Sequence, residues 1–217
     1  MIDVDLRRFL PDSTCDAWTK MVDIIPPDAY LAGGTGITAH LKHRVSRDLD
    51  FFSTAPLELE ALLAAMRAVG VVSVQRFAND TLSVVLDSTK VEVLSTPHIA
   101  LVRPTHTISG LRVADLADIQ AMKLRAVSDR GELRDYFDLM TLDRSHYPTE
   151  IGIGLFMEKF AQHVEDRQSA LTAVVLALGY LGDVTDDPTL PVGRSEIDAF
   201  WRHRQPQIAR HLSRFEA

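Results

Sequence analysis

A glycine-rich turn followed by two aspartates constrains the fold of this chain more than any other stretch of its sequence. Gly33, Gly34 and Thr35 end a short apolar run and open a helical one, and Asp48 and Asp50 stand at the start of a strand-like apolar run. Alternate side chains of a strand point to the same face, so both carboxylates are expected on one side. A helix N-terminus can hold phosphate, and paired carboxylates can hold a divalent cation. The stretch therefore indicates a nucleotide and metal site, unless the glycines only permit a tight turn.

The composition is that of a globular protein. A chain of 217 residues with 46% hydrophobic content can form one large domain or two small ones. Its one cysteine, Cys15, excludes an intramolecular disulfide and a cysteine-based zinc site. The N-terminus has no basic-then-apolar signal pattern, and the longest apolar stretch, 171–181, is too short to span a bilayer. We expect a cytoplasmic protein with no membrane partner.

The net charge of −7 disfavours a protein that coats nucleic acid without specificity. Positive charge gathers in two clusters, which are either solvated helix faces or, if the partner is RNA, its binding surface. The first cluster contains Lys42, His43, Arg44 and Arg47. The second contains Arg202, His203, Arg204, Arg210, His211 and Arg214.

Hydrophobic periodicity and turn residues predict alternating helices and strands in the first half of the chain. Expected helices are 13–25, a short one from Thr35 to about residue 43, and one capped by Ser53 or Thr54 with Pro56 in its first turn and Gly70 at its end. Expected strands are 29–32, 49–52, 71–77, 81–86 and 91–94. Glu92 alternates with valines, so its carboxylate points away from them. On a strand beside Asp48 and Asp50, it would be the third acid of a carboxylate cluster.

The second half of the chain is predicted to be helical. Residues 97–110 are expected to form a connector, the domain boundary falls between residues 110 and 111, and further helices are expected near 115–128, 130–140, 150–165, 168–181 and 194–215. Lys123 falls within an apolar helical stripe, where it either reaches to water or points into a cleft. In the next helix, Arg134, Asp135 and Asp138 project away from the apolar face, as expected for a surface ion pair between Arg134 and Asp138.

Four segments of the chain together resemble the AbiEii/AbiGii nucleotidyltransferase toxins of type IV toxin–antitoxin and abortive-infection systems, including the MenT-type enzymes. They are residues 32–35, 44–52, 118–123 and 134–139. The resemblance spans about residues 29–142. It implies an α+β fold, in which a mixed sheet with flanking helices, like that of the DNA polymerase β superfamily, precedes a C-terminal helical bundle.

The resemblance also implies roles for individual residues. It makes Gly33, Gly34, Thr35, Ser46, Arg47 and Arg134 nucleotide-binding residues. It makes Asp48, Asp50, Lys123 and Asp138 catalytic, with Asp135 beside them. Asp48, Asp50 and Glu92 become the ligands of Mg²⁺, although Glu92 stands where an aspartate is more usual and Thr35 replaces the commoner serine.

The activity implied by this resemblance is the transfer of a nucleotide from an NTP to RNA, at the 3′ end of tRNA, which blocks translation. A cognate antitoxin encoded nearby and a monomeric enzyme are expected. One alternative is a nucleotidyltransferase that modifies a small molecule or a protein hydroxyl. Another is a non-catalytic nucleotide-binding or partner-binding module with the same fold.

Overall fold

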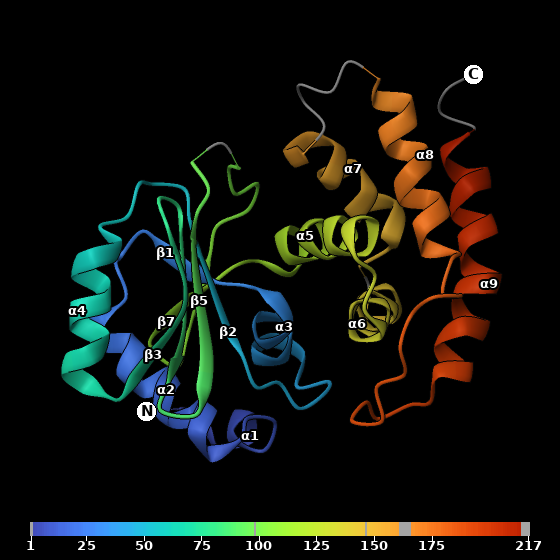
Figure 1. Cartoon of the computed structure of the whole chain (residues 1–217). Helices are drawn as coiled ribbons and strands as arrows, with labels where there is room; N and C mark the ends of the chain where they lie inside the picture. Colours follow the sequence, from blue (N-terminus) through green and yellow to red (C-terminus); the bar gives the residue numbers. More distant parts are fainter. Residues whose placement is uncertain (1, 98, 146, 161–165, 214–217) are drawn as a thin grey trace. The chain divides into compact units, whose positions relative to one another are not determined.

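The computed structural model describes residues 2–97, 99–145, 147–160 and 166–213. These residues form two compact units, Met1–Asp115 and Leu116–Ala217. The division lies five residues after the boundary expected between residues 110 and 111. Each unit has its own hydrophobic core. Figure 1 shows the helices and strands of both units.

Unit 1 is a mixed sheet flanked by helices. The strand order is β3-β4-β5-β2-β1-β7-β6. The helices are α1 Val4–Arg7, α2 Asp12–Ile24, α3 Gly33–Leu41 and α4 Leu59–Val69. The strands are β1 Ala29–Leu31, β2 Leu49–Ser53, β3 Val72–Ala78, β4 Thr81–Leu86, β5 Thr89–Ser95, β6 His106–Ile108 and β7 Leu111–Val113. Strand β2, which carries Asp50, runs antiparallel to β1 and parallel to β5.

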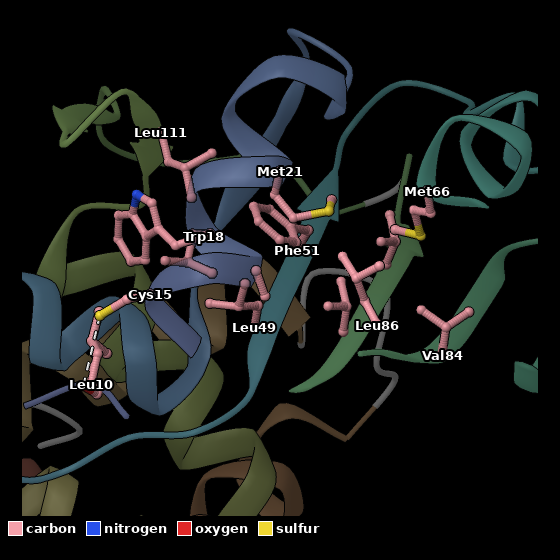
Figure 2. Packing of buried hydrophobic residues seen from close by; sticks show 14 of the residues in the cluster. Leu10, Cys15, Trp18, Met21, Leu49, Phe51, Met66, Val84, Leu86 and Leu111 are labelled. Carbon is pink, nitrogen blue, oxygen red and sulfur yellow. Dashed lines mark hydrogen bonds between the residues drawn. The ribbon is translucent and has the colours of Figure 1, made fainter. Parts of the chain in front are cut away.

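Side-chain alternation divides strand β2 between two environments. Leu49, Phe51 and Ser53 are buried, whereas Asp50 and Phe52 between them are partly exposed. Figure 2 shows Leu49 and Phe51 packed beside Trp18 and Met21 of α2. Because Asp50 points the other way, its carboxylate lies on the face opposite this core. Helix α3 packs against β2, across the sheet from α4 in Figure 1.

Two predictions for unit 1 are wrong. The helix expected to be capped by Ser53 or Thr54 begins later, at Leu59, because Ser53 is still paired with Ser95 of β5 in the sheet. The region expected to be a connector, 97–110, contains β6, which pairs with β7 at one edge of the sheet. These strands have three residues each and are too short to show a periodicity in sequence.

Unit 2 is a set of helices around a second core. They are α5 Leu116–Asp129, α6 Leu133–Arg144, α7 Thr149–Phe160, α8 Arg167–Leu178 and α9 Arg194–Leu212. The expected ends of the helices over 150–165 and 194–215 fall outside the described residues. Arg204 of α9 ties the unit together, since its guanidinium donates to Asp143 of α6 and to Glu150 of α7 at 2.6–3.1 Å. Among the described residues, no helix combines the length and apolarity needed to cross a membrane.

Candidate functional site

Helix α3 begins at the glycine-rich turn. Gly33 has φ of 61°, in the left-handed region that favours glycine, so the chain turns sharply from β1 into the helix. The N-cap residue, Ala32, offers no side-chain hydrogen bond, and the first turn contains no acid. The first N–H groups of a helix have no intrahelical partner and lie at the positive end of its dipole. This turn is therefore suited to receiving phosphate oxygens.

A chain of hydroxyl contacts joins this turn to the segment that carries Asp48. The Thr35 hydroxyl lies 2.7 Å from the hydroxyl of Ser46 and donates to the backbone carbonyl of Asp48. The backbone of Ser46 is anchored in turn, because its N–H donates to the carbonyl of Phe9 at 3.0 Å. Thr35 and Ser46 are both buried. Their hydroxyls therefore hold the aspartate segment against α3, a role that the sequence did not indicate.

Asp50 and Glu92 are direct partners in the parallel pairing of β2 and β5. Both side chains point away from the core of unit 1 and are partly exposed, as Asp48 is. The Glu92 carboxylate lies 3.5 Å from the ammonium of Lys90. Among the described residues, no three acidic, histidine or cysteine side chains lie close enough together to hold a metal ion. The structure thus brings Asp50 and Glu92 side by side without a preformed three-ligand site.

The two glycines of the turn each make room for a charged group. A Cβ added to Gly33 would overlap the carboxylate of Asp50, and one added to Gly34 would overlap the guanidinium of Arg44. The turn therefore lies between an anion and a cation. Both charged groups occupy space that a side chain at Gly33 or Gly34 would fill. Glycine is therefore required at both positions for space, and not only because the chain turns sharply.

The first basic cluster does not lie wholly on the surface. Arg44 is only 9% exposed, whereas Arg47 is exposed. In the second cluster, Arg204 is held by Asp143 and Glu150, Arg202 pairs with Asp198 at 2.5 Å, and Arg214 lies outside the described residues. Each cluster therefore contains one arginine, Arg44 or Arg204, that is not a freely solvated surface cation.

In unit 2, the expected surface location of Asp135 and Asp138 is wrong. Both side chains are fully buried, and the ammonium of Lys123 on α5 lies 2.6 Å from Asp135 and 2.8 Å from Asp138. Lys123 does not reach to water either, because its side chain is 8% exposed. A charged helix face is usually solvated, but here the buried ammonium of Lys123 on the neighbouring helix pairs with the two carboxylates and allows them to be buried. Arg134 donates to Glu132.

A second buried ion pair lies in the same unit and was not expected. Lys159 of α7 and Asp118 of α5 are 2.6 Å apart, with side chains 1% and 0% exposed. The only sequence signal was a lysine and an aspartate among apolar helix residues. The residues named as the site thus fall into two groups: Gly33, Gly34, Thr35, Ser46, Arg47, Asp48, Asp50 and Glu92 in unit 1, and Lys123, Arg134 and Asp138 in unit 2.

Comparisons with known proteins agree with this architecture. A protein of Aquifex aeolicus with no assigned function is 34% identical over 213 residues, which cover 96% of this chain and 98% of that one. The structure of MenT4, a nucleotidyltransferase toxin from Mycobacterium tuberculosis H37Rv, superposes with a TM-score of 0.63 at 18% identity, over 92% of this chain and 86% of that one. An H. pylori protein provisionally assigned as a nucleotidyltransferase gives a TM-score of 0.57 at 15% identity, over 95% and 97%. These two structures show the same fold.

The sequence match to a family is more extensive than the four motifs. Residues 23–217 match the family described as nucleotidyl transferase AbiEii toxin, type IV TA system. The match includes the whole of unit 2 and most of unit 1. The chain therefore belongs to the AbiEii nucleotidyltransferase toxins of type IV toxin–antitoxin systems.

Proposed function

We propose that this protein transfers a nucleoside monophosphate from an NTP to the 3′ end of tRNA and so blocks translation. The observation that carries the proposal is the placement of Asp50 beside Glu92 on neighbouring strands, with the Asp50 carboxylate against Gly33 of the turn. A nucleotide bound there would have its phosphates next to both the helix N-terminus and the acids. Nucleotidyl transfer needs that combination, because charge builds on phosphate oxygens during the reaction.

The acids of unit 1 suit Mg²⁺ in their chemistry, since hard oxygen ligands are those that Mg²⁺ prefers. In this proposal Asp48 and Asp50 hold the ion, and Glu92 joins them by turning away from Lys90. When bound, Mg²⁺ supplies positive charge to the triphosphate and lowers the pKa of the attacking hydroxyl.

The protein's own groups then bind the phosphates, position the acids and remove a proton from the acceptor. The amides at the start of α3 hold phosphate oxygens, while Thr35 and Ser46 keep the Asp48 segment in place. An oxygen of Asp50 or Glu92 takes the proton of the acceptor hydroxyl, whose oxygen forms a bond to the α-phosphorus as the bond to pyrophosphate breaks. The catalytic or nucleotide-binding roles that the family resemblance implies for Lys123, Asp138 and Arg134 of unit 2 remain proposals.

The acceptor can be identified by incubating the purified protein with each of the four α-labelled NTPs, Mg²⁺ and tRNA. We expect label in tRNA with an intact 3′ end and none in tRNA whose terminal ribose has been oxidised, which keeps the shape of the molecule but removes the attacking hydroxyls. Label found only in protein or in a small molecule would support the alternative acceptors and contradict the tRNA proposal.

The role of the acids is tested with a double variant, Asp48→Asn with Asp50→Asn. We expect labelling to fall about a hundredfold or more, because the charge that holds the metal is lost while side-chain size is kept. Asp23→Asn is the matched control, since Asp23 is exposed on α2 away from the turn. If the double variant labels RNA as fast as the parent, catalysis does not depend on these carboxylates.

A further inference from the structure

A row of polar side chains crosses the face of the sheet that lies opposite the core of unit 1. Asp50 of β2 is the pairing partner of Glu92 on β5. Glu92 is also paired with Ser83 of β4, and Ser83 is paired with Arg76 of β3. Residues directly opposite each other on neighbouring strands share one face of a sheet. The row that begins with two acids therefore ends with a cation at the edge of the sheet.

A β-bulge gives Arg76 its place in this row. The register with β4 shifts between Val74 and Arg76, so Gln75 is an extra residue of β3. Without the shift, Gln75 would lie opposite Ser83 and Arg76 would point to the core face, because side chains alternate along a strand. Bulges reorient side chains in this way, and they are frequent at sheet edges and beside active sites. The local backbone thus turns the cation of β3 toward the face that carries the acids.

Exposed side chains continue on the strands beyond Glu92. Ser73 and Arg76 of β3 and Lys90 of β5 are all exposed. Of the helices of unit 1, α3 packs against β2, whereas α4 packs against β4 from the core side. Figure 1 shows these two helices on opposite sides of the sheet. The polar side chains of β3 and β5 are therefore accessible to a ligand.

Lys90 is joined to the acid row by a weak contact. Its ammonium lies 3.5 Å from the Glu92 carboxylate, and the two side chains are 47% and 29% exposed. An ion pair with this much exposure contributes about 1 kcal/mol or less. In the proposed function Glu92 leaves Lys90 to join the metal, which releases the ammonium for another anion. Lys90 and Arg76 then present two cations on the β5–β3 side of the acids.

The glycine-rich turn and these cations lie on opposite sides of Asp50. Strand β2 has β1 on one side and β5 on the other, and the turn follows β1, where the N–H of Ala32 donates to the carbonyl of Asp50 at 2.9 Å. The proposed function places the triphosphate at this turn. The attacking and leaving oxygens of such a transfer are roughly in line, on opposite sides of the phosphorus. If pyrophosphate leaves on the α3 side, the acceptor hydroxyl approaches from the side of β5, β4 and β3.

We propose that the face formed by β5, β4 and β3 binds the acceptor RNA, with Lys90 and Arg76 contacting phosphates of the strand whose 3′ hydroxyl reacts. The inference rests on the proposed function, because it gives the same site a place for its acceptor. Two strand spacings, about 10 Å, separate Arg76 from Glu92. A nucleic-acid strand advances about 3.4 Å per nucleotide, so Arg76 meets the backbone a few nucleotides before the reacting end. Neither residue belongs to the two basic clusters seen in the sequence.

The first test compares tRNA binding by the parent, Arg76→Gln and Arg76→Lys. Fluorescently labelled tRNA is titrated with each protein at several salt concentrations, without NTP, and followed by anisotropy. We expect Arg76→Gln to weaken binding about threefold to tenfold and to reduce the salt dependence of log Kd by about one unit, because one phosphate contact is lost. Arg76→Lys keeps the charge and should bind within about twofold of the parent.

Steady-state labelling separates the acceptor from the nucleotide. With Mg²⁺ present, Arg76→Gln and Lys90→Gln should each raise the KM for tRNA about threefold or more, while the KM for the NTP changes less than about twofold. Arg67→Gln is the matched control, since Arg67 is exposed on α4, which packs on the core side of the sheet, and it should match the parent in both constants. Thermal unfolding shows whether each variant is folded, and Arg76→Lys remains informative if Arg76→Gln is not.

Each result has a distinct meaning. If the parent labels tRNA and either Arg76→Gln or Lys90→Gln uses tRNA equally well, the inference is wrong and the proposed function stands. An exposed arginine would then only protect the sheet edge from pairing. A raised KM for the NTP would also overturn the inference, because the cation would then act on the nucleotide. If the parent neither binds nor labels tRNA, it is the proposed function that fails.

Discussion

One ammonium group in unit 2 contacts two buried carboxylates, and the guanidinium of Arg130 lies 3.8 Å from one of them, Asp135. Asp135 and Asp138 have no exposed surface, and Lys123 is the cation nearest to both, at 2.6 and 2.8 Å. An ionised carboxylate removed from water is costly unless it is paired. Lys123 therefore has a structural role that is distinct from the nucleotide contact proposed for it.

Replacing Lys123 should destabilise the protein whatever its part in catalysis. We expect Lys123→Met to lower the free energy of unfolding of unit 2 by about 3–5 kcal/mol, because two buried carboxylates lose their nearest cation. Arg125→Met, on the exposed side of the same helix, removes only a surface pair with Asp129 and should cost less than about 1 kcal/mol. Urea unfolding followed by circular dichroism gives both values. Equal stability of Lys123→Met and the parent would show that this pairing is dispensable.

Single residues of the site were predictable where local pattern decides their position. Strand alternation placed Glu92 away from its flanking valines, which are buried while Glu92 is partly exposed and pairs with Asp50; Asp48, expected on the same strand as Asp50, precedes it. Asp135, Asp138 and Arg44 were misplaced, because a charge in sequence gives no sign of a partner from another segment. Burial of these groups depends on which elements meet in space, and local sequence pattern does not reveal that.

The C-terminal end of helix α3 contacts the last residues of unit 1 through a histidine pair. His40 Nε2 donates to the carbonyl of Ala114 at 2.9 Å, and His106 Nε2 lies 2.9 Å from the carboxylate of Asp115. The two imidazole rings pack edge to face, with centroids 5.2 Å apart. Helix α3, which begins at the glycine-rich turn, thus contacts the final residues of unit 1 near its C-terminal end.

The stability of unit 1 should depend on the protonation of His40. Burial lowers the pKa of His40 below its ordinary value of 6.5; His106 and Lys42 also lower it, while the hydrogen bond to Ala114 and the charge of Asp115 oppose the shift. The unfolded chain then binds a proton more readily than the folded one, so stability is present above pH 6.5 and is lost as the pH falls below it. One group contributes at most about 1.4 kcal/mol per pH unit.

The comparison variant is His40→Gln, whose amide can still donate to Ala114 but does not titrate. We expect the free energy of unfolding of the parent to decrease more than that of the variant between about pH 7 and pH 5. Denaturant unfolding at several pH values measures the difference. Parallel pH profiles for the two proteins would rule out a contribution from His40.

Helices and long strands were located well from sequence because proline, glycine and hydrophobic periodicity mark them clearly. Helix α2 ends before Pro26, and β4 and the core of β5 lie where alternation predicted. The start of α4 was placed too early, since a serine and a proline suggested a cap while the sheet continued through Ser53. Tertiary pairing prevailed over local capping chemistry there.

At the scale of the whole molecule, each unit contains one of the two tryptophans of the chain. Both are fully buried; Trp18 donates its indole N–H to the carbonyl of Ser109, and Trp201 donates to that of Tyr136. Each indole is therefore expected to report on the packing of its own unit.

This arrangement allows the stability of the two units to be compared in one molecule. Leu49→Ala removes a fully buried side chain from the core of unit 1 and should cost about 2–5 kcal/mol. We expect the fluorescence transition to shift more in the Trp201→Phe background, which retains Trp18, than in the Trp18→Phe background. Identical shifts in both would mean that the chain unfolds as one cooperative unit.

The pairing of β1 with β7 has a consequence for synthesis of the protein. Leu31 lies beside Val113 in the sheet, although the two are far apart in the chain, and β1 is also the neighbour of the aspartate strand. Contacts between such distant residues form slowly. A nascent chain still short of Val113 cannot complete the sheet, so the ribosome must translate past this residue before a toxin of this architecture can reach its active shape and harm the cell that makes it.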